Sequence, residues 1–225
     1  MNSEFQSGST GYLSGYTYNG VDQVISNYNG QPITLNITEN FSPGVSLNGD
    51  NFILKLPTGT LTVQNVTDKV VDFRDYSGNE IIKAYTPSTE GTIDGRGINA
   101  VEVIFGAANG SDVIFAGDGG SALWGGDGSF SDVLVGGGGR NFFYGGRYEG
   151  SDVFYNVSSS DVVNLTDATL SDIIAAVEVN GNIAIGFNTS NIITIQSTDN
   201  LSAAVNLADG SSWRFNHVTK SWQGA

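Results

Sequence analysis

Aspartate residues recur at a fixed spacing in the middle of the chain. Asp112, Asp132, Asp152 and Asp172 are twenty residues apart, and each follows a serine and precedes two apolar residues. If the chain forms equivalent coils that stack on one another, residues at this spacing lie about 4.8 Å apart. Carboxylates at that distance repel each other by about 0.9 kcal/mol per neighbour even in water. A hard divalent cation between successive turns would remove this cost.

Calcium is the cation that suits such turns. Ca²⁺ binds carboxylate and carbonyl oxygens at about 2.3–2.6 Å in irregular geometry, and glycine-rich turns expose their carbonyls. The candidate ligands are acidic residues in and beside these turns: Asp112, Asp132, Asp152, Asp172, Asp161, Asp118 and Asp127. The alternative is that the aspartates only accept hydrogen bonds from turn amides.

A coil of about twenty residues would position these carboxylates. Halfway between the aspartates the chain places Ser121, Asn141 and Asp161, again twenty apart, so each unit divides into segments of eleven and nine residues. An apolar residue fills the inward slot of every segment, at Ile114, Leu123, Leu134, Phe143, Phe154, Val163 and Ile174. Fifteen of the 31 glycines lie between Gly106 and Gly150, where they permit frequent reversals. A β-sandwich with glycine-rich turns is the alternative fold.

The flanks of the repeat also indicate short strands. Residues 52–56, 59–63, 69–73 and 80–83 are apolar-rich runs separated by turn residues, and Asn180-Gly181 is typical of a type I′ hairpin. We expect an all-β protein built around a parallel β-roll, or β-solenoid. Its regions would be a β-rich N-terminal part at 1–93, either separate or continuous with the solenoid, the roll at 94–175, and a hairpin cap at 176–225.

Two glycine-rich segments bring the sequence to a known family. Residues 125–128 (Gly-Gly-Asp-Gly) and 136–144 resemble the G-G-x-G-x-D-x-U-x nonapeptide of haemolysin-type (RTX) proteins. The resemblance covers about residues 105–175 and implies a parallel β-roll that binds Ca²⁺ in its turns, in secreted bacterial proteins exported by a type I system. The chain departs from the motif where Ser121 and Asn141 replace charged ligands, so we expect weak binding or none on that edge. Arg147, in a turn with two extra residues, could neutralise a neighbouring carboxylate.

Composition excludes several other functions. The chain has 225 residues, a formal charge of −14 and no cysteine. Thiolate metal sites and cysteine nucleophiles are therefore impossible, and the negative charge disfavours nucleic acid and anionic lipid surfaces. No apolar run is long enough for a membrane span. With one histidine, His217, and no G-x-S-x-G motif, we expect that the chain is not an enzyme.

Aromatic residues suggest a second kind of site. Alternation along the strands places Trp124, Tyr144 and Tyr155 on outer faces, where they could stack on sugar rings. Other parts of the chain or another protein chain could instead cover these faces.

The sequence thus favours a calcium-binding β-roll module of a secreted or cell-surface bacterial protein. It would fold on binding Ca²⁺ and serve a structural, secretion or adhesive role outside the cell. A metal-independent carbohydrate-binding or adhesive module, which recognises a cell-surface glycan through its aromatics, is the alternative.

Overall fold

The computed structural model consists of β-strands joined by short turns, and it describes residues 16–18, 22–26, 28–35, 44–56, 58–75 and 77–225. The chain divides into two compact units, Met1–Thr86 and Pro87–Ala225. The prediction of an all-β fold is confirmed, since the helical structure of the described residues is a single 3₁₀ turn, η1 (Leu170–Asp172). Within the same residues, no helix has the length and apolar character needed to cross a membrane.

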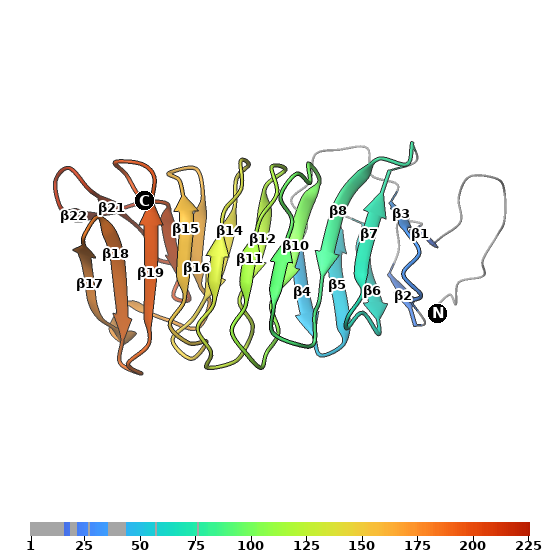
Figure 1. The fold of residues 1–225 in the computed structure, drawn as a ribbon, viewed down its shortest axis with the longest axis horizontal. Coiled ribbons are helices and arrows are strands. Elements are labelled where there is room, and N and C mark those ends of the chain that lie inside the picture. The colour runs from blue at the N-terminus through green and yellow to red at the C-terminus, as the bar shows by residue number, and fades with distance from the viewer. Residues whose placement is uncertain (1–15, 19–21, 27, 36–43, 57, 76) are drawn as a thin grey trace. The chain divides into compact units, whose positions relative to one another are not determined.

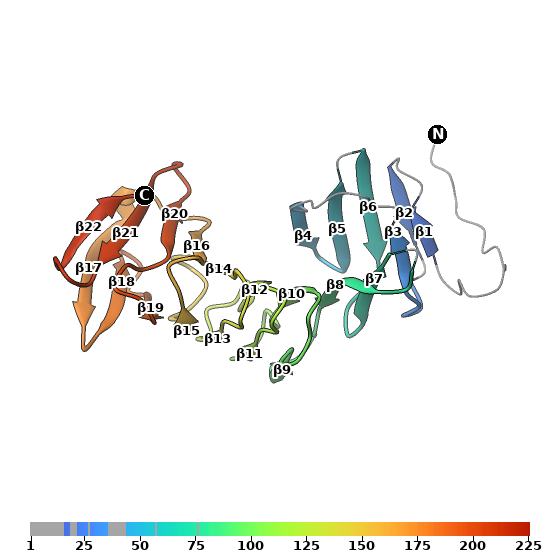
Figure 2. The same ribbon diagram turned by 90° about the horizontal axis from the view of Figure 1, so that it is seen from above.

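The second unit is a parallel β-roll, as predicted (Figures 1 and 2). Each coil contributes one strand to each of two sheets. The first sheet has the order β17-β18-β19-β15-β13-β11-β9, and in this unit the second has the order β10-β12-β14-β16-β20-β21-β22. The coils consist of β9 (Thr92–Asp94) and β10 (Val101–Phe105), β11 (Val113–Phe115) and β12 (Ser121–Trp124), β13 (Val133–Val135) and β14 (Phe142–Gly145), and β15 (Val153–Val157) and β16 (Val162–Leu165).

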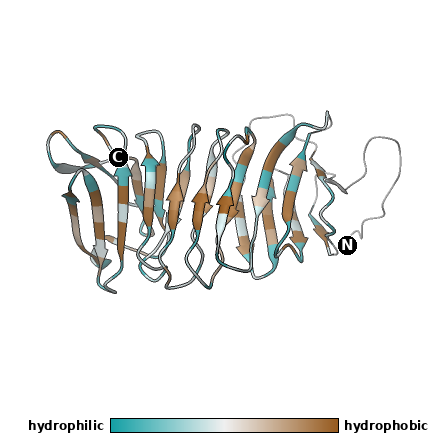
Figure 3. Ribbon diagram, in the orientation of Figure 1, coloured by the Kyte–Doolittle hydropathy of each residue, from teal (hydrophilic) through white to brown (hydrophobic). Residues whose placement is uncertain are grey.

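The register of the roll explains the twenty-residue repeat. Ile114 is paired with Leu134 and Leu134 with Phe154, so that each coil places an apolar residue beside its equivalent in the next. The other sheet repeats the pattern through Leu123, Phe143 and Val163, all with exposed fractions of 0%. Phe143 and Phe154 close the core from opposite sheets with ring centroids 5.3 Å apart. The strands in this part of the roll are mostly brown in Figure 3, because apolar side chains occupy both of their faces.

The roll departs from the repeat after β16. The chain forms η1 and the hairpin of β17 (Ile173–Val179) and β18 (Asn182–Phe187) before β19 (Ile192–Ser197) resumes parallel pairing with β15. β20 (Ala204–Leu207) then pairs with β16, and β21 (Ser212–Asn216) and β22 (Ser221–Gly224) follow as antiparallel strands. The hairpin turn at Asn180 and Gly181 has positive φ angles of 52° and 84°, as a type I′ turn requires.

This insertion overturns one prediction about the core. Ile174 was expected inside the roll, but its exposed fraction is 71%. Its strand β17 is an edge strand of the first sheet, and the strand that follows β15 in the stack is β19. The inward slot next to Phe154 is therefore filled by Ile195, which is fully buried.

The first unit contains two sheets and a core of its own. One sheet has the order β2-β6-β5-β4 and the other, within this unit, has the order β1-β3-β7-β8. Phe52 and Phe73 come from different sheets, and their ring centroids are 5.7 Å apart. The four strands expected between 52 and 83 are confirmed. The bounds are β1 (Tyr16–Tyr18), β2 (Gln23–Ile25), β3 (Ile33–Leu35), β4 (Gly44–Asn48), β5 (Asn51–Leu56), β6 (Gly59–Gln64), β7 (Val70–Arg74) and β8 (Glu80–Tyr85).

The regions 1–93, 94–175 and 176–225 remain a prediction as domains. Within the first of them, residues 1–15, 19–21, 27, 36–43, 57 and 76 lie outside the described residues.

Candidate metal centre on the aspartate edge

Three of the predicted aspartates form a buried ladder on one edge of the roll. Asp112, Asp132 and Asp152 end the turns that lead into β11, β13 and β15, and their exposed fractions are 1%, 3% and 2%. The Oδ1 atoms of Asp132 and Asp152 accept hydrogen bonds from the backbone amides of Asp112 (2.7 Å) and Asp132 (2.9 Å). Oδ1 of Asp112 accepts one from the Gly91 amide at 2.7 Å. Each carboxylate therefore fastens its coil to the preceding one, and we call this side of the roll the aspartate edge.

The second oxygen atoms of the ladder are less well satisfied. Oδ2 of Asp112 accepts a hydrogen bond from the Ala107 amide at 2.7 Å. For Oδ2 of Asp132 and of Asp152, the described residues supply no hydrogen-bond donor. These two atoms retain the capacity to bind a cation.

The ladder is electrostatically costly when all of it is ionised. Burial raises the pKa of Asp132 to about 7, and the charges of Asp152 and Asp112 add to this, against the effect of the amide hydrogen bond. Burial likewise raises the pKa of Asp152 to about 6 and shifts the pKa of Asp112 upwards. Desolvation of the charged form is the main cause in all three.

Glu149 extends this acidic region. Burial raises its pKa to about 7, and repulsion from Asp167, Asp127, Asp152 and Asp132 raises it further, in that order. The carboxylate forms no hydrogen bond or ion pair with the described residues. We refer to Asp127, Asp132, Glu149, Asp152 and Asp167 together as the acidic cluster.

Sequence reasoning missed two members of the acidic cluster. Asp167 follows Arg147 by twenty residues and Asp127 by forty, so the repeat spacing could have identified it. Glu149 has no equivalent acidic residue twenty positions away and gave no periodic signal.

Arg147 compensates only the far end of this region. Its guanidinium forms an ion pair with Asp172, its Nε lies 3.9 Å from Oδ2 of Asp167, and its backbone amide donates to Oδ1 of Asp167 at 2.8 Å. Among the described residues, no lysine or arginine pairs with Asp127, Asp132, Glu149 or Asp152. The expected neutralisation by Arg147 thus occurs, but away from the ladder.

Glycines bring backbone oxygens close to the ladder. A Cβ atom on Gly106 would lie 2.8 Å from Oδ2 of Asp112 and would overlap the carbonyl oxygen of Gly125. A Cβ on Gly125 would overlap Oδ2 of Asp132 in the same way. Because both glycines lack a positive φ angle, it is space that requires glycine there. At Gly106, Oδ2 of Asp112 and the carbonyl oxygen of Gly125 consequently approach the same point.

The donor set fits Ca²⁺ in kind. Every candidate ligand atom is oxygen, as Ca²⁺ prefers, and its shell of six to eight ligands accepts carbonyls and water. In the part of the chain that the structure describes, no three acidic or histidine side chains converge closely enough to hold an ion by themselves. A Ca²⁺ ion here would therefore rely on turn carbonyls and water beside the carboxylates.

Asp172 was expected to continue the ladder, and this is wrong. It lies in η1, where its Oδ2 accepts hydrogen bonds from the amide and hydroxyl of Thr169. The position beside Asp152 belongs to Ile193, because β19, not β17, pairs with β15. The hairpin insertion thus removes Asp172 from the stack.

The other two predicted ligands lie on the opposite edge. Asp161 is 1% exposed, and it accepts hydrogen bonds from the amides of Asn141 (2.6 Å) and Ser158 (2.7 Å). Asp118 is exposed in the turn between β11 and β12. Neither belongs to the acidic cluster.

Sequence reasoning also missed a carboxylate on the opposite edge. Glu102 pairs in register with Ser121 and is fully buried, and it accepts a hydrogen bond from the Gly117 amide at 2.5 Å. It precedes Ser121 by nineteen residues instead of twenty, which is why the repeat did not reveal it. The column of this edge is Glu102, Ser121, Asn141 and Asp161.

The three predicted ligand-binding aromatics lie on two different sheets. Trp124 stacks between Phe105 and Tyr144, with centroid separations of 4.5 and 4.0 Å and interplanar angles of 17° and 11°. Tyr155 is on the other sheet and is 37% exposed. Stacking occupies both faces of the Trp124 ring, and these are the faces that a sugar would need.

No protein-family model and no curated protein matches the sequence. Among solved structures, the chain is similar to the extracellular lipase LipA from Serratia marcescens, with 18% identity and a TM-score of 0.44. The match covers 82% of this chain and 32% of the lipase, so the chain spans about a third of that protein's length. The class that the structure itself defines is an all-β protein with a parallel β-roll.

The comparison also corrects one prediction. The chain was expected not to be an enzyme, whereas the solved structure that it resembles is that of a lipase. The claim that the chain lacks enzymatic activity is therefore not retained.

Proposed function

We propose that the roll is a calcium-binding module of a secreted or cell-surface bacterial protein, and that Ca²⁺ at the acidic cluster stabilises it. The observation that carries the proposal is a group of buried or partly buried carboxylates without a compensating cation among the described residues. The resemblance of residues 125–128 and 136–144 to the RTX nonapeptide supports it.

The acidic cluster offers ligands from successive coils. Oδ2 of Asp132 or of Asp152 would be a charged ligand, turn carbonyls and water would complete the shell, and the other carboxylates of the acidic cluster would add negative charge around the ion. A bound Ca²⁺ supplies positive charge beside Asp132, Glu149 and Asp152, with which no lysine or arginine of the described residues pairs. Because it binds the folded coils and not the extended chain, it shifts the folding equilibrium towards the roll.

The biological setting follows from the same resemblance. Extracellular Ca²⁺ is millimolar, and extracellular modules bind it with dissociation constants on the order of 10⁻⁴–10⁻³ M. The roll would then be less stable where Ca²⁺ is scarce and would condense after export through a type I route. Outside the cell it would anchor or present a larger protein to a surface glycan or another protein chain.

Isothermal titration calorimetry tests the proposal with two matched variants. Asp132→Asn and Asp118→Asn each replace one carboxylate with an amide, the first in the acidic cluster and the second in an exposed turn on the opposite edge. We expect the wild-type protein and Asp118→Asn to bind Ca²⁺ alike, and Asp132→Asn to bind at least about tenfold more weakly, since it removes a charged ligand. Absence of binding by the wild-type protein, or equal binding by both variants, would overturn the proposal.

A further inference from the structure

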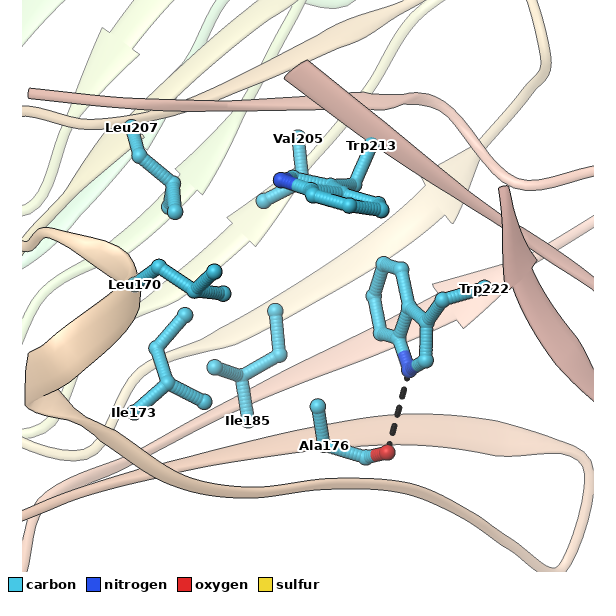
Figure 4. Close-up of a pocket in the computed structure, with 8 residues that line it drawn as sticks. All are labelled: Leu170, Ile173, Ala176, Ile185, Val205, Leu207, Trp213 and Trp222. Atoms are coloured by element: carbon cyan, nitrogen blue, oxygen red, sulfur yellow. Dashed lines mark hydrogen bonds between the residues drawn. The ribbon is translucent and has the colours of Figure 1, made fainter. Parts of the chain in front are cut away.

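Large apolar side chains are exposed on three successive turns of the aspartate edge. Phe130 and Tyr148, in the turns that lead into β13 and β15, are 45% and 59% exposed. Leu170, in η1, is 55% exposed and also lines the apolar pocket between the ends of the two sheets (Figure 4). Single exposed apolar residues are common on proteins, but a row of them on neighbouring turns indicates an interaction surface. We call these three side chains the apolar rim.

The turns that carry the apolar rim contact one another. A Cβ atom on Gly150, two residues after Tyr148, would overlap the carbonyl oxygen of Phe130 in the preceding turn. The backbone amide of Arg147 donates to Oδ1 of Asp167, in the following turn, at 2.8 Å. The apolar rim is therefore one continuous feature of the surface.

The opposite edge has no such row. Residues 116–120, 136–141 and 158–161 join the two strands of successive coils, and in these turns the structure places no exposed large apolar side chain. The turns 125–132 and 146–152 of the aspartate edge are longer, and each of them carries one ring of the apolar rim. In the coils, exposed apolar turn residues are thus confined to the edge that carries the acidic cluster.

The apolar rim lies directly beside the acidic cluster. Asp127 precedes Phe130 by three residues, and Glu149 follows Tyr148. With its formal charge of −14 the chain repels anionic surfaces, but Ca²⁺ at the acidic cluster would place positive charge next to the apolar rim. Because the described side chains converge too little to fill the shell of the ion, water would hold some positions, and an anionic oxygen of a partner can replace it.

This arrangement suits a lipid surface better than a protein. Phe, Tyr and Leu are side chains that favour the boundary between lipid headgroups and acyl chains. Each member of the apolar rim comes from its own turn, and a bilayer accepts separate side chains without a matching set of cavities. Anionic headgroups supply the oxygens that Ca²⁺ prefers.

We propose that the aspartate edge docks on an anionic phospholipid bilayer when Ca²⁺ is bound. Phe130, Tyr148 and Leu170 would enter the headgroup region, and Ca²⁺ would bridge the acidic cluster and the headgroups. The inference rests on the calcium site proposed above and assigns it a partner. Two weak contributions act together here, as stable attachment to a membrane surface commonly requires.

Cosedimentation with phospholipid vesicles tests the proposal. We expect binding to vesicles of phosphatidylcholine and phosphatidylserine in millimolar Ca²⁺, and none in chelator or to phosphatidylcholine alone. Phe130→Ser and Tyr148→Ser should each weaken binding about fivefold, because about half of each ring would leave water on docking. Val218→Ser, in the exposed turn between β21 and β22, should bind like the wild-type protein.

Calorimetric titration of Ca²⁺ without vesicles separates this proposal from the calcium site. We expect both rim variants to bind Ca²⁺ like the wild-type protein, since they keep every carboxylate. A wild-type protein that binds Ca²⁺ but no vesicles would overturn the docking alone, as would full vesicle binding by Phe130→Ser and Tyr148→Ser. Absence of Ca²⁺ binding would overturn the calcium site and the docking with it. Self-association in Ca²⁺ that Phe130→Ser abolishes would assign the apolar rim to a second copy of the chain instead.

Discussion

The two edges of the roll use the same architecture with different chemistry. On the aspartate edge, three successive coils carry the buried aspartates Asp112, Asp132 and Asp152. On the opposite edge, the two neutral residues Ser121 and Asn141 separate the buried carboxylates of Glu102 and Asp161. The coils stack in parallel register in either case.

This difference separates what the fold needs from what the charges add. The opposite edge shows that neutral side chains suffice to complete the coils, since Nδ2 of Asn141 donates to the Gly139 carbonyl at 2.9 Å within its own turn. On the aspartate edge, burial and, to a smaller extent, the adjacent carboxylates raise the pKa of Asp132, so its ionised form opposes folding at neutral pH. A row of charges that the architecture does not require is consistent with a site for a cation.

The largest losses of stability should come from the shared core and should be similar for the two sheets. Phe154 follows Asp152 of the aspartate edge by two residues, and Phe143 follows Asn141 of the opposite edge by two. Both rings are fully buried and contact each other, so Phe154→Ala and Phe143→Ala should each lower the free energy of unfolding by about 3–5 kcal/mol. Urea denaturation measures this. A loss confined to one variant would show that the two sheets do not share a core.

A smaller effect should distinguish the edges through their glycines. Gly125→Ala places a Cβ against Oδ2 of Asp132 and 2.7 Å from its Cγ, and it should cost about 1–3 kcal/mol by overpacking. Gly136→Ala on the opposite edge meets its neighbours at 3.0 Å or more and should cost less. Equal losses in urea denaturation would contradict the close approach at the ladder.

Replacing one carboxylate with an amide should change the stability in opposite directions on the two edges. In chelator, Asp132→Asn keeps an oxygen for the Asp112 amide and removes repulsion, so it should raise stability by about 1 kcal/mol. Asp161→Asn turns an N–H group towards the donors of Asn141 or Ser158, and should lower stability by about 1–2 kcal/mol. Destabilisation by both variants would mean that the ladder is purely structural.

In chelator, the stability of both edges together should also depend on pH. Asp132, Asp152 and Glu149 have pKa values of about 7, 6 and 7 when folded, against about 3.9–4.3 when unfolded. Between these limits the folded state binds more protons, so its stability should increase as pH falls from about 7 to about 4. Melting temperatures should rise by several degrees over this range, and less in Asp132→Asn. A steady decrease on acidification would contradict the assignment.

The repeat made much of the roll predictable. Twenty-residue spacing placed the apolar slots from Ile114 to Val163 and the ladder from Asp112 to Asp152, because each coil repeats the same register. It failed at Asp172 and Ile174, where an antiparallel hairpin stands in place of the next coil. The twenty-residue spacing continues through this hairpin, so the spacing alone does not reveal it.

The rest of the site depends on contacts between turns. Glu149 lies near enough to Asp127 and Asp167 for their charges to raise its pKa, because successive coils bring their turns together. The spacing in the sequence alone did not show this.

Thermal unfolding in chelator and in millimolar Ca²⁺, at about pH 8 where these carboxylates ionise, tests the central claim most directly. We predict that Ca²⁺ raises the melting temperature of the wild-type protein, that Mg²⁺ does so far less, and that Asp132→Asn loses most of the Ca²⁺ response. A melting temperature that is the same in chelator and in Ca²⁺ would contradict the account. The aspartates of the ladder would then serve only as hydrogen-bond acceptors for backbone amides.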